Sequence, residues 1–300
     1  MKYPMLLLIM IMIMTAPILA SPGLERAPVN GGYLTYQQSG EGEVILTIHG
    51  ALVADSFVPI MNQPVLDGYR LIRYRRSGYS DSAPLDLSTG GLLEKAAADA
   101  VALLDHLEVD RAHVVGHSLG GMIALELAWQ SPERVQTLML LEPAIMQVPA
   151  AEQMLEQIAP ALAHHEDGDS VAAVDAFLTR LIRPEWQELM ESQMPGAVDQ
   201  AIANADTFFG IEVPALAQHE FDGKRAARLS MPALYVLGSE SSAIAHADGF
   251  FEQGKQLLLQ TLPNARSVRL EGVDHSLQFG FPERLASTIT EFVAAHPIEE

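Results

Sequence analysis

One serine in a cramped position constrains this chain more than any other feature. Ser118 lies in Gly-His-Ser-Leu-Gly, residues 116–120, after an apolar stretch typical of a strand and before one typical of a helix. A chain that passes from strand to helix within about one residue strains the corner backbone, and flanking glycines avoid the collisions that a Cβ atom would cause. The pattern therefore predicts a sharp turn that exposes the serine hydroxyl at a helix N-terminus, where developing negative charge is stabilised.

Strands and helices alternate on both sides of this turn. Short apolar runs typical of strands stand at residues 31–40, 43–50, 69–76, 112–118, 135–143, 231–238 and 265–272. Stretches with helical spacing or composition stand at residues 88–109, 119–130, 250–263 and 282–296. This alternation predicts an α/β fold in which a mostly parallel sheet is flanked by helices on both faces.

The alternation stops within residues 145–228. Consecutive stretches of this segment have helical patterns, and none of them reads as a strand: residues 150–168, 169–182, 183–194 and 196–210. We therefore expect an α/β core of residues 21–144 and 229–300 that is interrupted by a helical cap of residues 145–228. Because sites in open α/β sheets form at the carboxyl ends of the strands, an insert that leaves from that edge would cover the site.

Residues 1–20 differ from the rest of the chain. One lysine is followed by an apolar run from Met5 to Met14, then by Pro17 and the small residue Ala20. This order is typical of a secretory signal peptide with cleavage after Ala20, and the apolar run is short for a bilayer span. We therefore expect a periplasmic or secreted protein that has no stable membrane insertion after cleavage.

Composition excludes several classes of partner and chemistry. The formal net charge of −20 disfavours binding to nucleic acid phosphates, and no basic cluster offsets it. The chain contains no cysteine, which excludes disulfides, a cysteine nucleophile and thiolate metal sites. Nothing in the sequence pattern indicates an oligomeric state.

A serine nucleophile needs a base, and His275 is the best placed of the ten histidines. It follows the last predicted strand and precedes the final helix, and α/β enzymes with this kind of turn place their histidine after the serine in the chain. Two backbone N–H groups should stabilise the oxyanion that forms during acyl transfer. We assign them to Leu119, directly after the serine, and to Ala51, which follows the strand of residues 43–50.

Five stretches together resemble the α/β-hydrolase fold superfamily, in its cap-bearing branch: LTIHGAL, RYRRSGYSDS, VVGHSLGGMIALELA, LMLLEPA and GVDHSLQFGFPE. The resemblance covers residues 30–297, with the insert only loosely matched. It implies an eight-stranded, mostly parallel sheet, a helical cap and a Ser–His–acid triad that works without a cofactor or metal. The chain departs from the family at Arg75-Arg76-Ser77-Gly78, where relatives have Asp before an Arg-Gly pair, and this change is expected to alter only a structural turn.

The acid of the triad is the second departure from the family. In most relatives an Asp stands three residues after a glycine at the end of the next-to-last core strand. Here that position, counted from Gly238, is Ser241, which cannot serve, and Glu240 stands one residue earlier. The haloalkane-dehalogenase-like branch instead places a Glu after the strand that follows the elbow helix, which corresponds to Glu142. The resemblance therefore implies Glu142 as the acid, with Glu240 as the alternative.

Together these features predict a serine hydrolase for a small or medium acyl substrate, a carboxylic ester or a lactone, that acts through an acyl-enzyme. A serine nucleophile argues against dehalogenase and epoxide-hydrolase chemistry, which needs a carboxylate nucleophile. A C–C bond hydrolase of the same fold is an alternative because it uses the same triad. A non-catalytic ligand-binding receptor is a further alternative.

Overall fold

The computed structural model describes residues 23–88, 90–219, 221–241 and 249–299, so the predicted signal peptide lies outside the described residues. The strands are β1 (Glu25–Val29), β2 (Gly32–Ser39), β3 (Val44–Ile48), β4 (Arg70–Arg75), β5 (Ala112–His117), β6 (Val135–Leu141), β7 (Ala233–Gly238) and β8 (Ala265–Leu270). The α-helices are α1 (Val58–Met61), α2 (Leu92–His106), α3 (Leu119–Gln130), α4 (Ala151–Glu166), α5 (Ser170–Leu181), α6 (Trp186–Gln193), α7 (Ala197–Ala203), α8 (Val213–Ala217), α9 (Gly223–Ala226), α11 (Phe250–Thr261), α12 (Leu277–Gly280) and α13 (Pro282–Ala294). Two 3₁₀ turns are η1 (Pro64–Leu66) and η2 (Pro132–Arg134), and η3 (Asp206–Glu212) is a π-helix.

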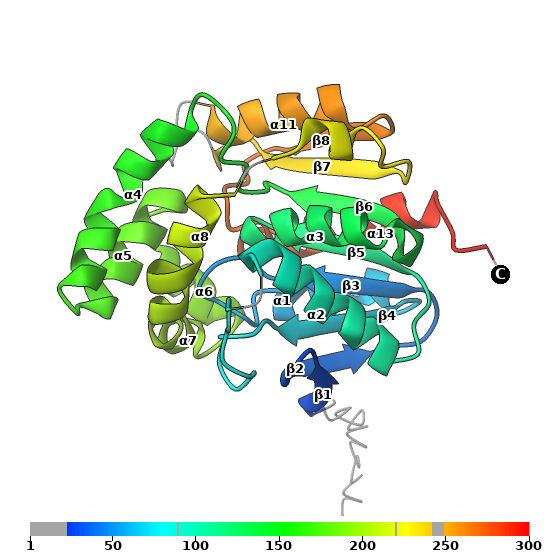
Figure 1. The fold of residues 1–300 in the computed structure, drawn as a ribbon, viewed down its shortest axis with the longest axis horizontal. Coiled ribbons are helices and arrows are strands. Elements are labelled where there is room, and N and C mark those ends of the chain that lie inside the picture. The colour runs from blue at the N-terminus through cyan, green and yellow to red at the C-terminus, as the bar shows by residue number, and fades with distance from the viewer. Residues whose placement is uncertain (1–22, 89, 220, 242–248, 300) are drawn as a thin grey trace, which may run out of the picture.

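The strands form one eight-stranded sheet in the order β1-β2-β4-β3-β5-β6-β7-β8 (Figure 1). The β1–β2 and β2–β4 pairs are antiparallel, and all later pairs are parallel. The expected eight-stranded, mostly parallel sheet is therefore confirmed, while β1 is a strand that the sequence pattern did not indicate. Because β3, β5 and β6 are neighbours, the segments that follow these three strands meet at one edge of the sheet.

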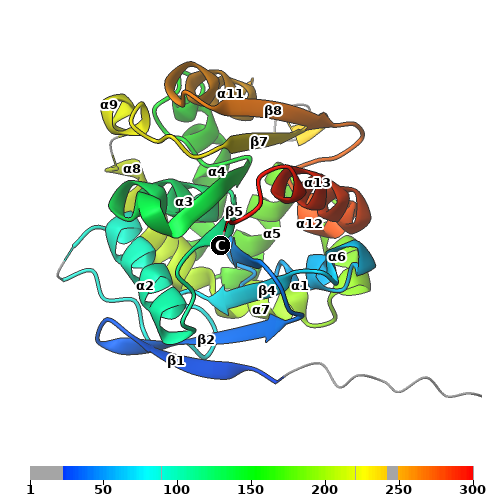
Figure 2. The ribbon, with the colours of Figure 1, turned by 90° about the vertical axis from the view of Figure 1, so that its right-hand side faces the viewer.

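Alternate residues of the central strands pack into cores on opposite faces of the sheet. Val114 belongs to the core that includes α2 and α3, whereas its neighbour Val115 belongs to the core that includes α13. Figure 2 shows α2 and α3 on one side of the sheet and α12 and α13 on the other. The nearly all-apolar strands noted in the sequence are thus buried on both faces, as parallel strands require.

The helices from α4 to α8 occupy the chain between β6 and β7, and Figure 1 shows most of them grouped to one side of the sheet. Side chains from α4, α5, η3 and α8 line a cavity together with residues that follow β3, β5 and β6. These helices, hereafter the insert, therefore cover the carboxyl edge of the sheet. The division into core and cap at residues 145–228 stays a prediction. Among the described helices, none has both the length and the hydropathy that a bilayer crossing requires.

Candidate active site

Ser118 alone joins β5 to α3. Its backbone angles, φ 53° and ψ −120°, lie in a region that residues with side chains rarely adopt. A Cβ atom on Gly116 would collide with the backbone of Gly120, and one on Gly120 would collide with the carbonyl oxygen of Ile48. The two glycines therefore permit the close backbone approach that this strained turn requires.

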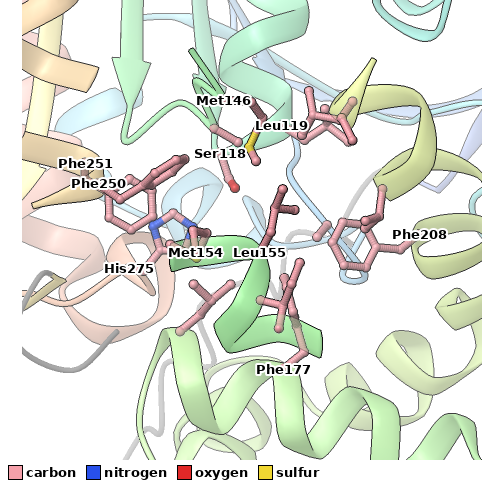
Figure 3. Close-up of a pocket in the computed structure, with 17 residues that line it drawn as sticks. Ser118, Leu119, Met146, Met154, Leu155, Phe177, Phe208, Phe250, Phe251 and His275 are labelled. Atoms are coloured by element: carbon pink, nitrogen blue, oxygen red, sulfur yellow. The ribbon is translucent and has the colours of Figure 1, made fainter. Parts of the chain in front are cut away.

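Ser118 and His275 line one cavity, and the empty space within it and at its mouth amounts to about 600 Å³. Figure 3 shows the Ser118 hydroxyl directed into this cavity, with the His275 ring at its wall. The remaining walls are apolar, and methionine, leucine and phenylalanine dominate them, among them Met154, Phe177 and Phe208. We call this space the apolar cavity.

His275 is held in one orientation by contacts on several sides. Its Nδ1 lies 2.6 Å from Oε2 of Glu142, so the Nδ1–H donates to that carboxylate and leaves Nε2 as the acceptor nitrogen. The Phe251 ring stacks on the imidazole with 4.4 Å between ring centroids. The Nε2–H of His117 donates to the backbone oxygen of His275 over 3.0 Å. The side chain of His275 is only 6% exposed, so its ring has little freedom to turn.

Glu142 is fully buried directly after β6, and both of its carboxylate oxygens have partners. Oε2 accepts from His275, and Oε1 accepts from the backbone N–H of Gly238 over 2.7 Å. Its backbone φ of 45° turns the chain sharply at the end of the strand. A buried carboxylate is costly unless it is hydrogen-bonded or paired, and here two donors meet this requirement.

The alternative acid, Glu240, lies elsewhere. It is exposed, and its Oε1 accepts from the hydroxyl of Ser239 over 3.2 Å. The neighbouring Ser241 is fully buried, and its hydroxyl has no hydrogen-bond partner among the described residues. Of the two glutamates, the structure thus brings Glu142 to His275 and leaves Glu240 at the surface.

Ala51 and Leu119, the expected oxyanion donors, both line the apolar cavity beside Ser118. Within the described part of the chain, neither backbone N–H has a hydrogen-bond partner. Leu119 is the first residue of α3, where the N–H has no acceptor within the helix. Both groups are therefore free to bind an oxygen that carries negative charge.

His49 shapes the loop that carries Ala51. Its Nδ1–H donates to the backbone oxygen of Gly50 over 2.9 Å, and its Nε2 accepts from the backbone N–H of Arg76 over 3.0 Å. Burial and the nearby Arg76 guanidinium hold the pKa of His49 well below its usual range, so the ring stays neutral in this role. A Cβ atom on Gly50 would be crowded by Ser118 and by the backbone oxygen of His117, so glycine fits closely here.

Arg76 links this loop to the insert, a role that the sequence pattern did not reveal. Its guanidinium donates to the backbone oxygen of Gly50 over 2.8 Å and forms a buried ion pair with Glu212 of η3. The hydroxyl of Tyr79 donates to the same carboxylate over 2.5 Å. The only sequence signal was a lone acidic residue within an apolar stretch, Phe208 to Ala215, and no local pattern identifies its partner.

Further hydrogen bonds fasten α7 and η3 to the loops after β3 and β4. Asn204 donates to the backbone oxygen of Leu52 over 2.7 Å, and Thr207 donates to that of Gly78 over 2.6 Å. In the segment that carries His275, the Asp274 carboxylate accepts from Arg183 of the insert. The insert is thus hydrogen-bonded to the loops after β3 and β4 and to the segment that carries His275. Among the described residues, no three His, Asp or Glu side chains are grouped closely enough to hold a metal ion.

Comparison with known proteins agrees with this architecture. A family model described as alpha/beta hydrolase fold matches residues 43–282. The chain is 26% identical over 283 residues to the dihydrolipoyllysine-residue acetyltransferase component of the acetoin cleaving system of Pseudomonas putida, covering 92% of this chain and 70% of that protein. It is 26% identical over 286 residues to rhodomycin D methylesterase of Streptomyces peucetius, and the match covers 83% of this chain and 90% of that protein. The enol-lactonase from Burkholderia xenovorans LB400 superposes with a TM-score of 0.69 at 20% identity, covering 90% of this chain and 100% of that one.

Proposed function

Because this chain belongs to the α/β-hydrolase fold family, we propose that it is a serine hydrolase that cleaves carboxylic esters or lactones through an acyl-enzyme. One observation carries the proposal. The Ser118 hydroxyl and the His275 imidazole border one apolar cavity, and His275 is hydrogen-bonded through its other nitrogen to the buried carboxylate of Glu142. In this proposal the three residues form the catalytic triad, and Ala51 and Leu119 form the oxyanion hole.

The reaction follows from the assigned nitrogens. The Oγ atom of Ser118 attacks the substrate carbonyl carbon while its proton passes to Nε2 of His275. The Nδ1–H stays donated to Glu142, whose charge stabilises the imidazolium. The oxyanion accepts from the two free backbone N–H groups. The bond to the leaving oxygen then breaks, and that oxygen takes the proton from Nε2.

A second half-reaction restores the enzyme. Water attacks the acyl carbon of the ester that Ser118 now carries, and Nε2 of His275 takes a proton from this water. The carbon–Oγ bond breaks, the proton returns to Oγ, and the free acid leaves. No group other than water is consumed.

The cavity wall supports an apolar substrate. Its lining consists almost entirely of aliphatic, aromatic and methionine side chains, so it stabilises hydrocarbon parts of a substrate better than charged ones. Two proteins to which this chain is similar, a methylesterase and an enol-lactonase, carry names that denote cleavage of an ester or a lactone. The insert supplies Met154, Phe177 and Phe208, so we propose that it acts as a cap that selects the length of the hydrocarbon part.

Activity profiling with the mature protein tests this function. We expect turnover of p-nitrophenyl esters and of acyl lactones, with a preference for medium chains, and labelling of Ser118 by a fluorophosphonate. Cleavage of β-diketones without ester turnover would reassign the protein as a C–C hydrolase. Absence of both turnover and labelling would favour a non-catalytic receptor and refute the proposal.

The cap role has its own readout. Phe208→Ala should shift the preferred acyl chain length while labelling by a small phosphonate stays near the wild-type rate, because the phosphonate does not reach Phe208. A uniform loss of labelling without a shift in preference would contradict a selecting cap.

A further inference from the structure

A second cavity adjoins the apolar cavity at Ser118. The two cavities share five lining residues: Ala51, Ser118, Phe177, Leu181 and His275. The rest of its wall comes from the loop after β3, which includes Ser56, and from the segment after His275, which includes Gln278. Apolar side chains of the insert, such as Leu178 and Met190, complete it. The proposed nucleophile therefore borders two adjoining spaces that a substrate with two arms could occupy at once.

Two polar side chains of this second cavity are buried without partners. Ser56 is 5% exposed and Gln278 is 1% exposed. Neither the Ser56 hydroxyl nor the Nε2 group of Gln278 has a hydrogen-bond partner among the described residues. Leaving a buried donor unpaired costs about 1–3 kcal/mol, and other buried groups, the Ser241 hydroxyl among them, also lack a partner within the described residues. Ser56 and Gln278 are set apart because both line a cavity next to the proposed nucleophile, where a ligand can supply the missing partner.

Most residues that line the second cavity are apolar, and its few polar side chains carry no charge. None of the described residues that line it is Asp, Glu, Lys or Arg. His117, which also lines it, donates its Nε2–H to the backbone oxygen of His275, and burial together with the nearby His275 holds the pKa of His117 well below its usual range. The amide nitrogen of Gln278 can only donate a hydrogen bond, while the Ser56 hydroxyl can donate or accept. The fitting partner is therefore a neutral oxygen acceptor rather than a carboxylate or an ammonium group.

We propose that the second cavity binds a short substrate arm that carries a neutral oxygen acceptor, an ether, carbonyl or hydroxyl oxygen, which Gln278 and Ser56 hydrogen-bond. The hydrocarbon arm of the same substrate occupies the apolar cavity, so the substrate is amphiphilic on the two sides of its reacting carbon. This inference rests on the proposed function, because it assumes that the reacting carbon binds at Ser118.

Two matched phosphonates test the assignment. Each is a p-nitrophenyl ester of octylphosphonic acid, and the remaining alkoxy arm is 2-methoxyethyl in one and butyl in the other, so that a single oxygen replaces a methylene. Ser118 attacks phosphorus and p-nitrophenolate leaves, so the rate of its release measures the choice of arm without requiring turnover. In the wild type, we expect the methoxyethyl compound to react faster than the butyl compound by a factor on the order of ten, which corresponds to about one net hydrogen bond.

Substitutions then locate the preference. Gln278→Met and Ser56→Ala should each reduce the ratio of the two rates toward one, while Gln256→Met, the same change at an exposed position on α11, should leave it unchanged. The thermal midpoint of Gln278→Met should equal or exceed that of the wild type, because an unpaired buried amide is removed.

The outcomes separate the two proposals. If Ser118 reacts but the wild type shows no preference, or if Gln278→Met and Ser56→Ala keep it, the second cavity does not bind such an arm although the hydrolase proposal survives. A marked loss of thermal stability in both variants would show that Ser56 and Gln278 serve the fold, and would also overturn the inference. If neither phosphonate labels wild-type Ser118, the proposed function itself is wrong.

Discussion

Glu142→Gln changes the proposed acid with the smallest possible change in shape. In the wild type, one carboxylate oxygen accepts from Nδ1–H of His275 and the other accepts from the backbone N–H of Gly238. A glutamine has one oxygen and one NH₂ group in these places. If its oxygen stays at Gly238, the NH₂ donates to Nδ1 and forces the imidazole into the tautomer whose Nε2 already carries a proton. If its oxygen faces His275, two donors meet at Gly238.

The arrangement in which the glutamine NH₂ faces His275 sets the size of the expected loss of activity. An imidazole with a protonated Nε2 cannot take the proton of Ser118, and the imidazolium would also lose its negative partner. Loss of this tautomer control costs about 10⁴ in turnover in serine hydrolases, which corresponds to about 5 kcal/mol at the transition state. The matched control is Glu240→Gln. Because Glu240 is exposed and its carboxylate accepts from the neighbouring Ser239 hydroxyl, we expect a loss below about tenfold, or under about 1.4 kcal/mol.

The assay is kcat/KM on a medium-chain p-nitrophenyl ester for wild type, Glu142→Gln and Glu240→Gln, with circular dichroism to confirm that each variant is folded. A larger loss of kcat/KM in Glu240→Gln than in Glu142→Gln would identify Glu240 as the acid. Two mild effects would show that something other than a glutamate orients His275. Either result would refute the reasoning from the hydrogen bonds of Glu142.

Four further expectations follow from the same structure. Ser118→Ala and His275→Ala should each reduce turnover by about 10³ or more while the protein stays folded, since triad members act as a unit; near-wild-type turnover in either variant would exclude the triad. Glu212→Gln should lower the free energy of unfolding by about 3–5 kcal/mol, measured by urea denaturation, because it leaves the buried Arg76 guanidinium without its charged partner. The free energy of unfolding should fall as pH drops below about 6.5, because the depressed pKa values of His49 and His117 let the unfolded chain bind protons that the folded chain does not. Each of these two histidines contributes up to about 1.4 kcal/mol per pH unit; a flat profile from pH 7 to 5 would contradict the expectation. Expressed in a bacterium, the protein should appear outside the cytoplasm beginning at residue 21, and mass spectrometry that finds Met1 on a cytoplasmic product would exclude export.

Local pattern was sufficient for the features that neighbouring residues produce. The strand–helix alternation, the strained turn at Ser118 and the position of His275 after the last strand all depend on short-range periodicity or on the order of elements along the chain. The same periodicity missed β1, since Glu25–Val29 is a short, mostly exposed edge strand without a clear apolar alternation. Where the backbone is specified locally, the sequence is an adequate guide.

Tertiary structure decided which distant side chains meet. Glu142 and Glu240 both follow strands that end at the same edge, and only the folded backbone shows that Glu142 faces His275 and the Gly238 N–H while Glu240 faces outward. The pairing of Arg76 with Glu212 and the placement of Ser56 with Gln278 likewise join segments that are far apart in the chain. Such contacts depend on the order of strands in the sheet and on how the insert packs over the sheet edge. Local periodicity reports which residues share a face of one element, so it does not identify partners that packing brings together from distant parts of the chain.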